Sequence, residues 1–206
     1  MKVVLVNGSP HEKGCTFTAL SEVAGALHKN RIETEIFWIG TNPVRGCVAC
    51  GTCRKNGGRC VYDDDPCNHM IDIFTSADGI VIGSPVYYAG PNGVLCALLD
   101  RVFFAGSSGY KYKPAAAIAS CRRAGAISSF DRLNKYFTIN NMPIVSSQYW
   151  NDIHGTNPEE AKRDLEGMQI MRTLGDNMAW LLKNLAGEKT AIPISYEEKI
   201  RTNFIR

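Results

Sequence analysis

KVVLVNGSPHEKGCT, residues 2–16, is the stretch that decides the fold. The run Val3–Val6 is apolar and rich in β-branched residues, which predicts a buried strand. Asn7-Gly8-Ser9-Pro10 follows it and predicts a loop. From Thr16 to about Asn30, apolar residues then recur at helical spacing. This order of strand, loop and helix is the opening unit of an α/β fold.

The same unit recurs along the chain, because apolar runs alternate with helical patterns. Further strands are predicted at 33–39, 79–83, 115–120 and 143–147, and further helices at 67–76, 92–104, 126–137 and 158–185. This alternation predicts a parallel sheet with helices on both faces. We expect a single domain over 1–206, with a cysteine-rich insertion at about 40–66 and a C-terminal tail at about 187–206.

Composition restricts the class of protein. The chain has 206 residues, of which 45% are hydrophobic and 21% charged, with a net charge of +3. No basic run with interleaved aromatic residues indicates nucleic-acid binding. No apolar segment approaches the roughly 20 residues that span a bilayer, and the N-terminal apolar run is too short for a signal-peptide core. We therefore expect a cytoplasmic protein with no membrane contact, where clustered cysteines bind metals or act in catalysis more often than they form disulfides.

The loop after the first strand resembles a phosphate-binding loop in its chemistry. Ser9, Thr16 and Thr18 offer hydroxyl groups, while Gly8 and Gly14 allow the backbone to approach an anion closely. The N-terminus of the following helix favours a phosphate. The loop matches neither the Gly-Lys-Ser/Thr of a Walker A sequence nor G-x-G-x-x-G. A turn that only caps the helix is the alternative.

A second loop, GSPVYYAGPNG at 83–93, follows the third predicted strand. Its glycines and prolines and the pair Tyr87-Tyr88 suit a planar ring, which needs backbone amides and an aromatic wall. The alternative is a rigid turn with tyrosines on the surface. Because this loop and the first both follow strands of a parallel sheet, together they favour a mononucleotide with a planar ring, of which FMN is the obvious candidate.

At this point the sequence resembles a known family. VNGSPHEKGCT and IVIGSPVYYAGPNGVLCALLDR are similar to the NADPH-dependent FMN reductase and iron–sulfur flavoprotein branch of the flavodoxin-like superfamily. The resemblance extends from Lys2 through the last long helix. It implies a three-layer α/β/α sandwich, with a five-stranded parallel sheet of order 2-1-3-4-5, that binds FMN non-covalently. The first loop of relatives usually reads G-S-P-R-x-x-G-N-T, so His11 and Cys15 stand where Arg and Asn are common.

The resemblance also implies the cofactor contacts. Amides of 85–90 are expected along the isoalloxazine ring, and Arg122 or Arg123 after the fourth strand is expected to stabilise negative charge on the reduced ring, unless the pair is simply solvated. Tyr149-Trp150 is expected after the fifth strand, as a wall of the site, a subunit contact or core. The predicted FMN-binding residues are Ser9, His11, Gly14, Cys15, Thr16, Phe17, Thr18, Pro85, Val86, Tyr87, Tyr88, Ala89, Gly90 and Arg122.

The segment GCVACGTCRKNGGRC, residues 46–60, carries Cys47, Cys50, Cys53 and Cys60. These cysteines are crowded for zinc, whose structural sites usually pair two C-x2-C knuckles a dozen or more residues apart. A [4Fe–4S] cluster suits compact spacing. Iron–sulfur flavoproteins resemble this chain in carrying a C-x2-C-x2-C motif and a nearby fourth cysteine at this position, which we expect near the flavin edge of the sheet. Unmetallated thiols or redox pairs, zinc and structural disulfides remain the alternatives.

These features predict an FMN-dependent oxidoreductase. Electrons are expected to enter from NAD(P)H as hydride, or from ferredoxin through a cluster, and to leave to a small-molecule acceptor. A ferredoxin-linked electron-transfer module without NAD(P)H reductase activity is one alternative, and a thiol-based redox-sensing flavodoxin-like protein is another. No catalytic acid or base is evident, and a homodimer or homotetramer is expected.

Overall fold

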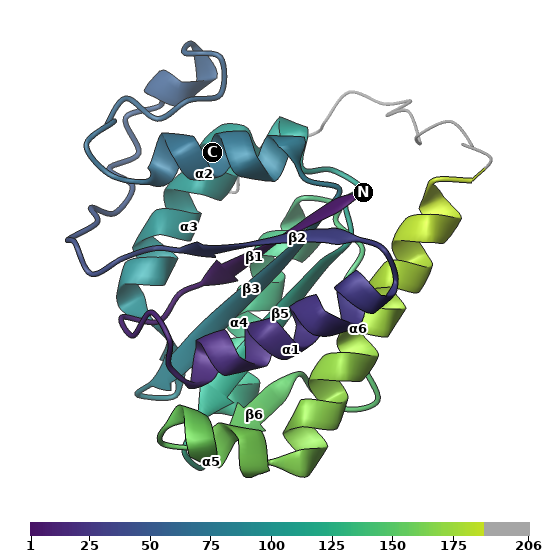
Figure 1. Ribbon diagram of the computed structural model, residues 1–206. Helices are drawn as coiled ribbons and strands as arrows, with labels where there is room; N and C mark the ends of the chain where they lie inside the picture. The colour runs from purple at the N-terminus through teal and green to yellow at the C-terminus, as the bar shows by residue number, and fades with distance from the viewer. Residues whose placement is uncertain (188–206) are drawn as a thin grey trace, which may run out of the picture.

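The computed structural model describes residues 1–187 and contains a parallel sheet between two layers of helices (Figure 1). The strands are β1 (Lys2–Asn7), β2 (Glu33–Trp38), β3 (Gly79–Tyr87), β4 (Gly90–Pro91), β5 (Ala115–Cys121) and β6 (Asp152–His154). Their order is β2-β1-β3-β5-β6, all parallel, while β4 pairs only with β3 and is antiparallel to it. With the two-residue β4 set aside, this is the predicted flavodoxin-like order 2-1-3-4-5.

The helices are α1 (Cys15–Lys29), α2 (Cys67–Ser76), α3 (Gly93–Gly106), α4 (Ala126–Ile139), α5 (Pro158–Arg163) and α6 (Leu165–Leu185). Short 3₁₀ turns lie at Thr52–Arg54 and Ser107–Gly109. No helix within residues 1–187 is both long and apolar enough to cross a bilayer.

Alternate residues of each buried strand face opposite layers. On β1, Val3 and Leu5 pack with α1 and α6, whereas Val4 and Val6 pack with α2 and α3. Both faces are therefore covered, which explains why the apolar run of β1 is continuous instead of alternating with polar residues.

The fifth strand lies elsewhere than predicted. Pro143–Val145 meets β5 through one bridge, between Ala115 and Ile144, and the chain then leaves the sheet. It returns as β6, which pairs with 119–121 of β5. The prediction of a strand at 143–147 was wrong because that apolar run touches β5 only at the start of β5. Tyr149-Trp150 consequently precedes the last strand instead of following it.

The last predicted helix is divided into α5 and α6. Asp164 leaves helical geometry with ψ of 82°, and its carboxylate accepts a hydrogen bond from the Gly167 amide at 2.9 Å. Asp164 therefore caps the second helix where an uninterrupted helix was expected. Asn157 caps α5 as predicted. Apart from Gly187, the predicted tail lies outside the described residues.

Candidate functional site

A cleft of about 680 Å³ opens where the carboxyl ends of the strands meet. Its size falls within the roughly 300–1,000 Å³ of small-molecule sites. The loops after β1 and β6 line it with residues 9–16 and 155–158. The carboxyl ends of β2, β3 and β5 contribute Trp38, 85–87 and 120–122. The topology thus brings segments far apart in the sequence to one edge of the sheet.

Buried Asn7 shapes the first loop. Its side-chain oxygen accepts a hydrogen bond from the Ser9 amide at 3.1 Å, and its side-chain nitrogen donates to the Glu12 carbonyl at 2.8 Å. The Ser9 hydroxyl oxygen in turn accepts from the His11 amide at 3.1 Å. These bonds fold residues 7–12 into a compact turn that leads into α1.

The N-terminus of α1 is open toward the cleft. Gly14 is the N-cap residue, and no side chain among the described residues caps this helix. Gly14, Cys15 and Thr16 line the cleft. The first amides of a helix have no partner within it and carry partial positive charge, so this end of the cleft fits a phosphate.

The first and second loops are held together through their backbones. The Gly8 amide donates to the Gly83 carbonyl at 2.9 Å, and the Asn92 side chain donates to the Gly8 carbonyl at 2.7 Å. A Cβ on Gly8 would lie 2.8 Å from the Gly83 oxygen and 2.4 Å from a methyl of Leu95. Only glycine therefore fits at this crossing point.

The second loop has a strained backbone. Tyr88 and Ala89 both adopt left-handed conformations, with φ of 50° and 57°. From α4, the Ser128 hydroxyl donates to the Ala89 carbonyl at 2.5 Å, and Gly125 approaches so closely that an added Cβ would lie 2.8 Å from Ala89 Cα. Two adjacent non-glycine residues in this region cost free energy, and neighbouring structure holds them there.

The structure brings nine of the predicted FMN-binding residues to the lining of the cleft: Ser9, His11, Gly14, Cys15, Thr16, Pro85, Val86, Tyr87 and Arg122. Phe17 and Thr18 line a neighbouring groove. Tyr88, Ala89 and Gly90 lie beyond the residues that line the cleft, with Tyr88 fully exposed.

Charged side chains and the side chain of Cys15 line the cleft. Arg122 is exposed at its edge and Lys13 adds a second cation, while Glu12 contributes one carboxylate to the lining. The Cys15 thiol donates to the Gly155 carbonyl at 3.6 Å, and burial raises its pKa. Cys15 is therefore a protonated lining residue, while the cations suit an anionic ligand.

Trp38 and the loop 155–158 also line the cleft, and neither was predicted. Trp38 donates its indole N–H to the Ser9 carbonyl at 2.8 Å, so β2 supports the first loop. The position of Trp38 at the carboxyl end of a predicted strand could have indicated this role. The loop 155–158 could not be recognised, because the strand before it was misplaced.

A second cavity is lined by all four motif cysteines; we call it the cysteine cavity. Its lining residues are Cys47, Val48, Cys50, Gly51, Cys53, Cys60, Val61, Tyr62, Arg101, Phe104 and Ala105. Cys47 and Cys50 are exposed, and Cys53 and Cys60 are half-buried. Four thiols around one apolar space form a donor set suited to an iron–sulfur cluster. Among the described residues, however, no three Cys, His, Asp or Glu side chains converge closely enough to hold a metal ion.

The cysteine cavity lies away from the cleft, contrary to expectation. The insertion begins at the carboxyl end of β2 but packs on the second half of α3, where Arg54 stacks on Phe104 and Gly58 approaches the Ala105 carbonyl. The two sites share no lining residue. From the start of α3, beside the second loop, to Phe104 the helix rises by about 16 Å.

A parallel sheet of this order, with a compact turn after β1 that leads into an uncapped helix N-terminus and an open cleft at the carboxyl edge, defines a flavodoxin-like fold. The chain belongs to the NADPH-dependent FMN reductase family, whose model matches residues 1–157. It is therefore a flavin-dependent oxidoreductase, and FMN is its cofactor.

Relatives and solved structures agree with this assignment. An iron-sulfur flavoprotein of Methanocaldococcus jannaschii is 29% identical over 191 residues, covering 89% of this chain and 98% of the relative. An iron-sulfur flavoprotein of Methanosarcina thermophila is 29% identical over 176 residues, covering 83% and 90%.

Among solved structures, RosB with bound 8-demethyl-8-formylriboflavin-5'-phosphate has a TM-score of 0.74 at 14% identity, covering 100% of this chain and 96% of RosB. A flavodoxin from the domain Archaea has a TM-score of 0.60 at 15% identity, covering 89% and 99%. At these identities the structures show a shared fold.

Proposed function

We propose that this protein is an NAD(P)H-dependent FMN oxidoreductase in which Cys47, Cys50, Cys53 and Cys60 hold a [4Fe–4S] cluster that exchanges electrons with FMN. The observation that carries the proposal is that these four cysteines, from one compact motif, line a single cavity. The curated relatives named iron-sulfur flavoprotein support the same assignment.

FMN would be held in the cleft by groups that the fold already positions. The open N-terminus of α1 would bind its phosphate, together with the turn of residues 9–14. Pro85–Tyr87 would lie along the ring, and Arg122 would stabilise negative charge on the reduced ring. When bound, FMN accepts a hydride or single electrons, so the protein's part is to bind, orient and tune it.

A cluster held in the cysteine cavity would supply single-electron chemistry at some distance from the flavin. Val48, Val61 and Phe104 surround the thiols with apolar surface, and Arg101 brings a positive charge to a group of thiolates. Burial and charge around the sulfurs set the potential of a cluster. These residues therefore fit the cluster by donor set and surroundings.

A ferredoxin-linked electron-transfer module is the second candidate. It is favoured by the exposure of Cys47 and Cys50, which places the cysteine cavity on the outside of the chain where a protein donor could approach. Under this alternative the cluster accepts electrons from reduced ferredoxin, and the chain has no pyridine-nucleotide reductase activity of its own. Assembly into a homodimer or homotetramer stays a prediction for either function.

The test is steady-state oxidation of NADH and NADPH by anaerobically purified protein, compared with reduction of the same protein by reduced ferredoxin. Turnover of NADH or NADPH that depends on FMN supports the reductase. Rapid reduction by ferredoxin without pyridine-nucleotide turnover would replace the reductase with the electron-transfer module. A protein that accepts electrons from neither donor would contradict both functions.

A further inference from the structure

Arg101 is a charged residue in the middle of the largely apolar helix α3, and it is only 2% exposed. A buried charge is costly unless it is paired and fully hydrogen-bonded. The FMN cleft does not use this residue, so its contacts indicate what it does.

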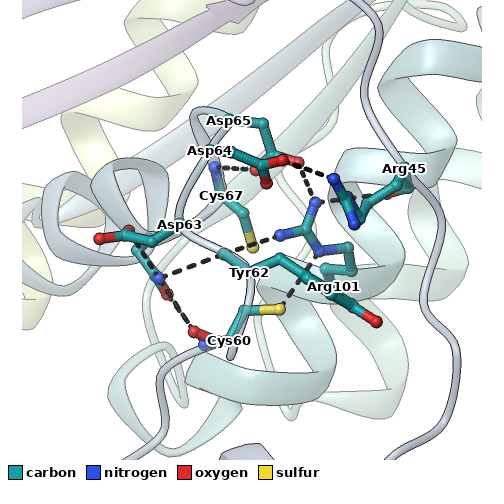
Figure 2. A network of polar contacts seen from close by, with 9 residues as sticks. Arg45, Cys60, Tyr62, Asp63, Asp64, Asp65, Cys67 and Arg101 are labelled. Carbon is teal, nitrogen blue, oxygen red and sulfur yellow. Dashed lines mark hydrogen bonds and ion pairs between the residues drawn. The ribbon is translucent and has the colours of Figure 1, made fainter.

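Within residues 1–187, the polar partners of Arg101 all belong to the cysteine-rich insertion (Figure 2). The guanidinium pairs with the buried carboxylate of Asp65 and donates to the carbonyls of Arg45 at 3.3 Å and Tyr62 at 3.1 Å. Its Nε donates to the Cys60 sulfur at 3.3 Å. The Arg101 side chain of α3 thus binds three separate residues of the cysteine-rich insertion and also the sulfur of Cys60.

An arginine guanidinium is not deprotonated in proteins, and the buried Asp65 carboxylate pairs with this one. The guanidinium therefore stays charged beside the Cys60 sulfur. A hydrogen bond from a cation to a thiolate is stronger than one between neutral groups.

The backbone of Cys60 is fixed as well. The Cys60 amide donates to the side-chain oxygen of Asn68 at 2.8 Å, and the Asn68 nitrogen donates to the Cys60 carbonyl at 3.0 Å. Asn68 is buried in the first turn of α2, and Asp65 accepts from the Cys67 amide at 3.0 Å at the start of the same helix. Cys60 is therefore held by α2 through its backbone and by α3 through its sulfur.

The other three cysteines have no such attachment. Cys47 and Cys50 are exposed, and Cys53 lies in the 3₁₀ turn at Thr52–Arg54. Hydrogen bonds from Thr52 reach the Cys50 sulfur, but Thr52 belongs to the same loop and does not tie this sulfur to α2 or α3. The four proposed ligands are thus unequal, with one fixed to the helical layer and three on the loop.

We infer that Arg101 is a positioning residue that fixes Cys60 as the anchoring ligand of the iron–sulfur centre and supplies the positive charge that sets the potential of this centre. The inference deepens the proposed function and rests on it. A donor to a ligand sulfur, together with a nearby cation, stabilises the more negative, reduced form of a cluster.

The two parts of this role can be separated by substitution. Lysine keeps the charge but lacks the planar fork that reaches the Tyr62 and Arg45 carbonyls and the Cys60 sulfur together. Glutamine removes the charge and leaves Asp65 uncompensated. The double variant Arg101→Gln with Asp65→Asn removes both charges, so it tests the role without leaving a buried carboxylate unpaired.

Arg132→Gln is the matched control. Arg132 of α4 pairs with Asp100 of α3 at 3.3 Å, but this pair is exposed and does not line the cysteine cavity. All variants are purified anaerobically as the full chain with FMN bound, and FMN content serves as the check that the sheet and the cleft are folded.

Two readouts test the inference. The first is the midpoint potential of the centre, which is expected to become more negative in Arg101→Gln, to return part of the way to the parental value in Arg101→Lys and to stay unchanged in Arg132→Gln. In the double variant the lost Asp65 carboxylate offsets part of the lost cation, so a smaller negative shift is expected from the missing hydrogen bond to the Cys60 sulfur. The second is trypsin cleavage of the iron-free protein at exposed Arg54, Lys55 and Arg59, which is expected to accelerate roughly tenfold or more when Arg101 no longer docks the insertion.

The outcomes separate the inference from the function on which it rests. If the parent protein holds iron, and the double variant has the same midpoint potential and the same trypsin cleavage rate as the parent, the role inferred for Arg101 is wrong. The proposal of a cluster is unaffected by that outcome. A parent protein that holds no iron after anaerobic purification and reconstitution overturns the cluster itself. If Arg101→Lys shifts the midpoint potential as far from the parental value as Arg101→Gln does, the electrostatic part of the inference is wrong.

Discussion

The cleft proposed to hold FMN and the cysteine cavity are built in opposite ways. The cleft is formed largely by backbone groups at the ends of buried strands and at the start of α1, and buried Asn7 and Asn92 fix its loops. The cysteine cavity is formed by side chains of a long connection, two of whose thiols are exposed. The sheet therefore preorganises the first site, whereas the second depends on a few anchors to α2 and α3.

This difference indicates which substitutions should disturb each site. A change to the backbone of the cleft should disturb FMN and leave the thiols untouched. A change to an anchor of the insertion should do the reverse, because the two sites share no lining residue.

The largest effect is expected from Gly8→Ala. The new Cβ would lie 2.8 Å from the Gly83 carbonyl oxygen, a backbone atom that cannot move without shifting β3. We expect FMN affinity to fall roughly tenfold to a hundredfold and the free energy of unfolding to fall by about 1–3 kcal/mol. Flavin fluorescence titration and urea unfolding measure the two quantities.

Gly25→Ala is the control for this substitution. Gly25 lies in α1 with nothing within 4 Å of an added Cβ, so alanine should leave FMN affinity unchanged and stabilise the helix by up to about 1 kcal/mol. If Gly8→Ala bound FMN as the parent does, the tight crossing of the two loops would not determine the site.

Two buried asparagines offer a reciprocal test of intermediate size. Asn92→Ala removes the donor to the Gly8 carbonyl, and Asn68→Ala removes the two hydrogen bonds that hold the Cys60 backbone. Each should cost about 1–3 kcal/mol in the free energy of unfolding. We expect Asn92→Ala to weaken FMN binding at parental iron content, and Asn68→Ala to lower iron content at parental FMN affinity.

Metal analysis and flavin titration of both proteins check this expectation, and each variant is the control for the other. Loss of iron in Asn92→Ala equal to that in Asn68→Ala would show that the two sites are coupled. In that case the account of two independently built sites would be wrong.

The smallest effect concerns thiol reactivity in iron-free protein. Hydrogen bonds from Thr52 lower the pKa of Cys50, whereas burial raises the pKa of Cys15 in the cleft. Because the thiolate is the nucleophile, Cys50 should be alkylated faster than Cys15 at neutral pH, and the midpoint of its pH–rate profile should lie lower. Peptide mapping by mass spectrometry after timed alkylation measures both rates.

Thr52→Val removes the hydroxyl that contributes most to the lowered pKa of Cys50. It should slow alkylation of Cys50 by roughly threefold at neutral pH and leave Cys15 unchanged. Equal rates for Cys50 in the parent and in Thr52→Val would reject the hydroxyl as the cause.

The same comparison explains what could be predicted from the sequence. The apolar run of β1 and the loop 7–16 predict a strand, a turn and a helix start through local patterns alone, and the structure has all three. The strand at 143–147 carries an equally good local pattern. Pairing with β5 is instead completed by 152–154, which depends on contacts that no local pattern encodes.

Arg101 illustrates the limit within the site. In the sequence it stands beside Asp100 in a largely apolar helical pattern, and a solvent-facing position would be the ordinary expectation. Its partner Asp65 is 36 positions away, and only the path of the insertion over α3 brings them together. The motif spacing predicted which cysteines would share a cavity, but not where that cavity would lie.

Iron and acid-labile sulfide per FMN, determined on anaerobically purified parent protein and on Cys60→Ser, test the central claim most directly. We predict about four iron atoms and four sulfides per FMN in the parent, and FMN without iron in Cys60→Ser. A parent protein with FMN but no iron, one zinc in place of iron, or iron retained in full by Cys60→Ser would contradict the claim that these four thiols hold a [4Fe–4S] cluster.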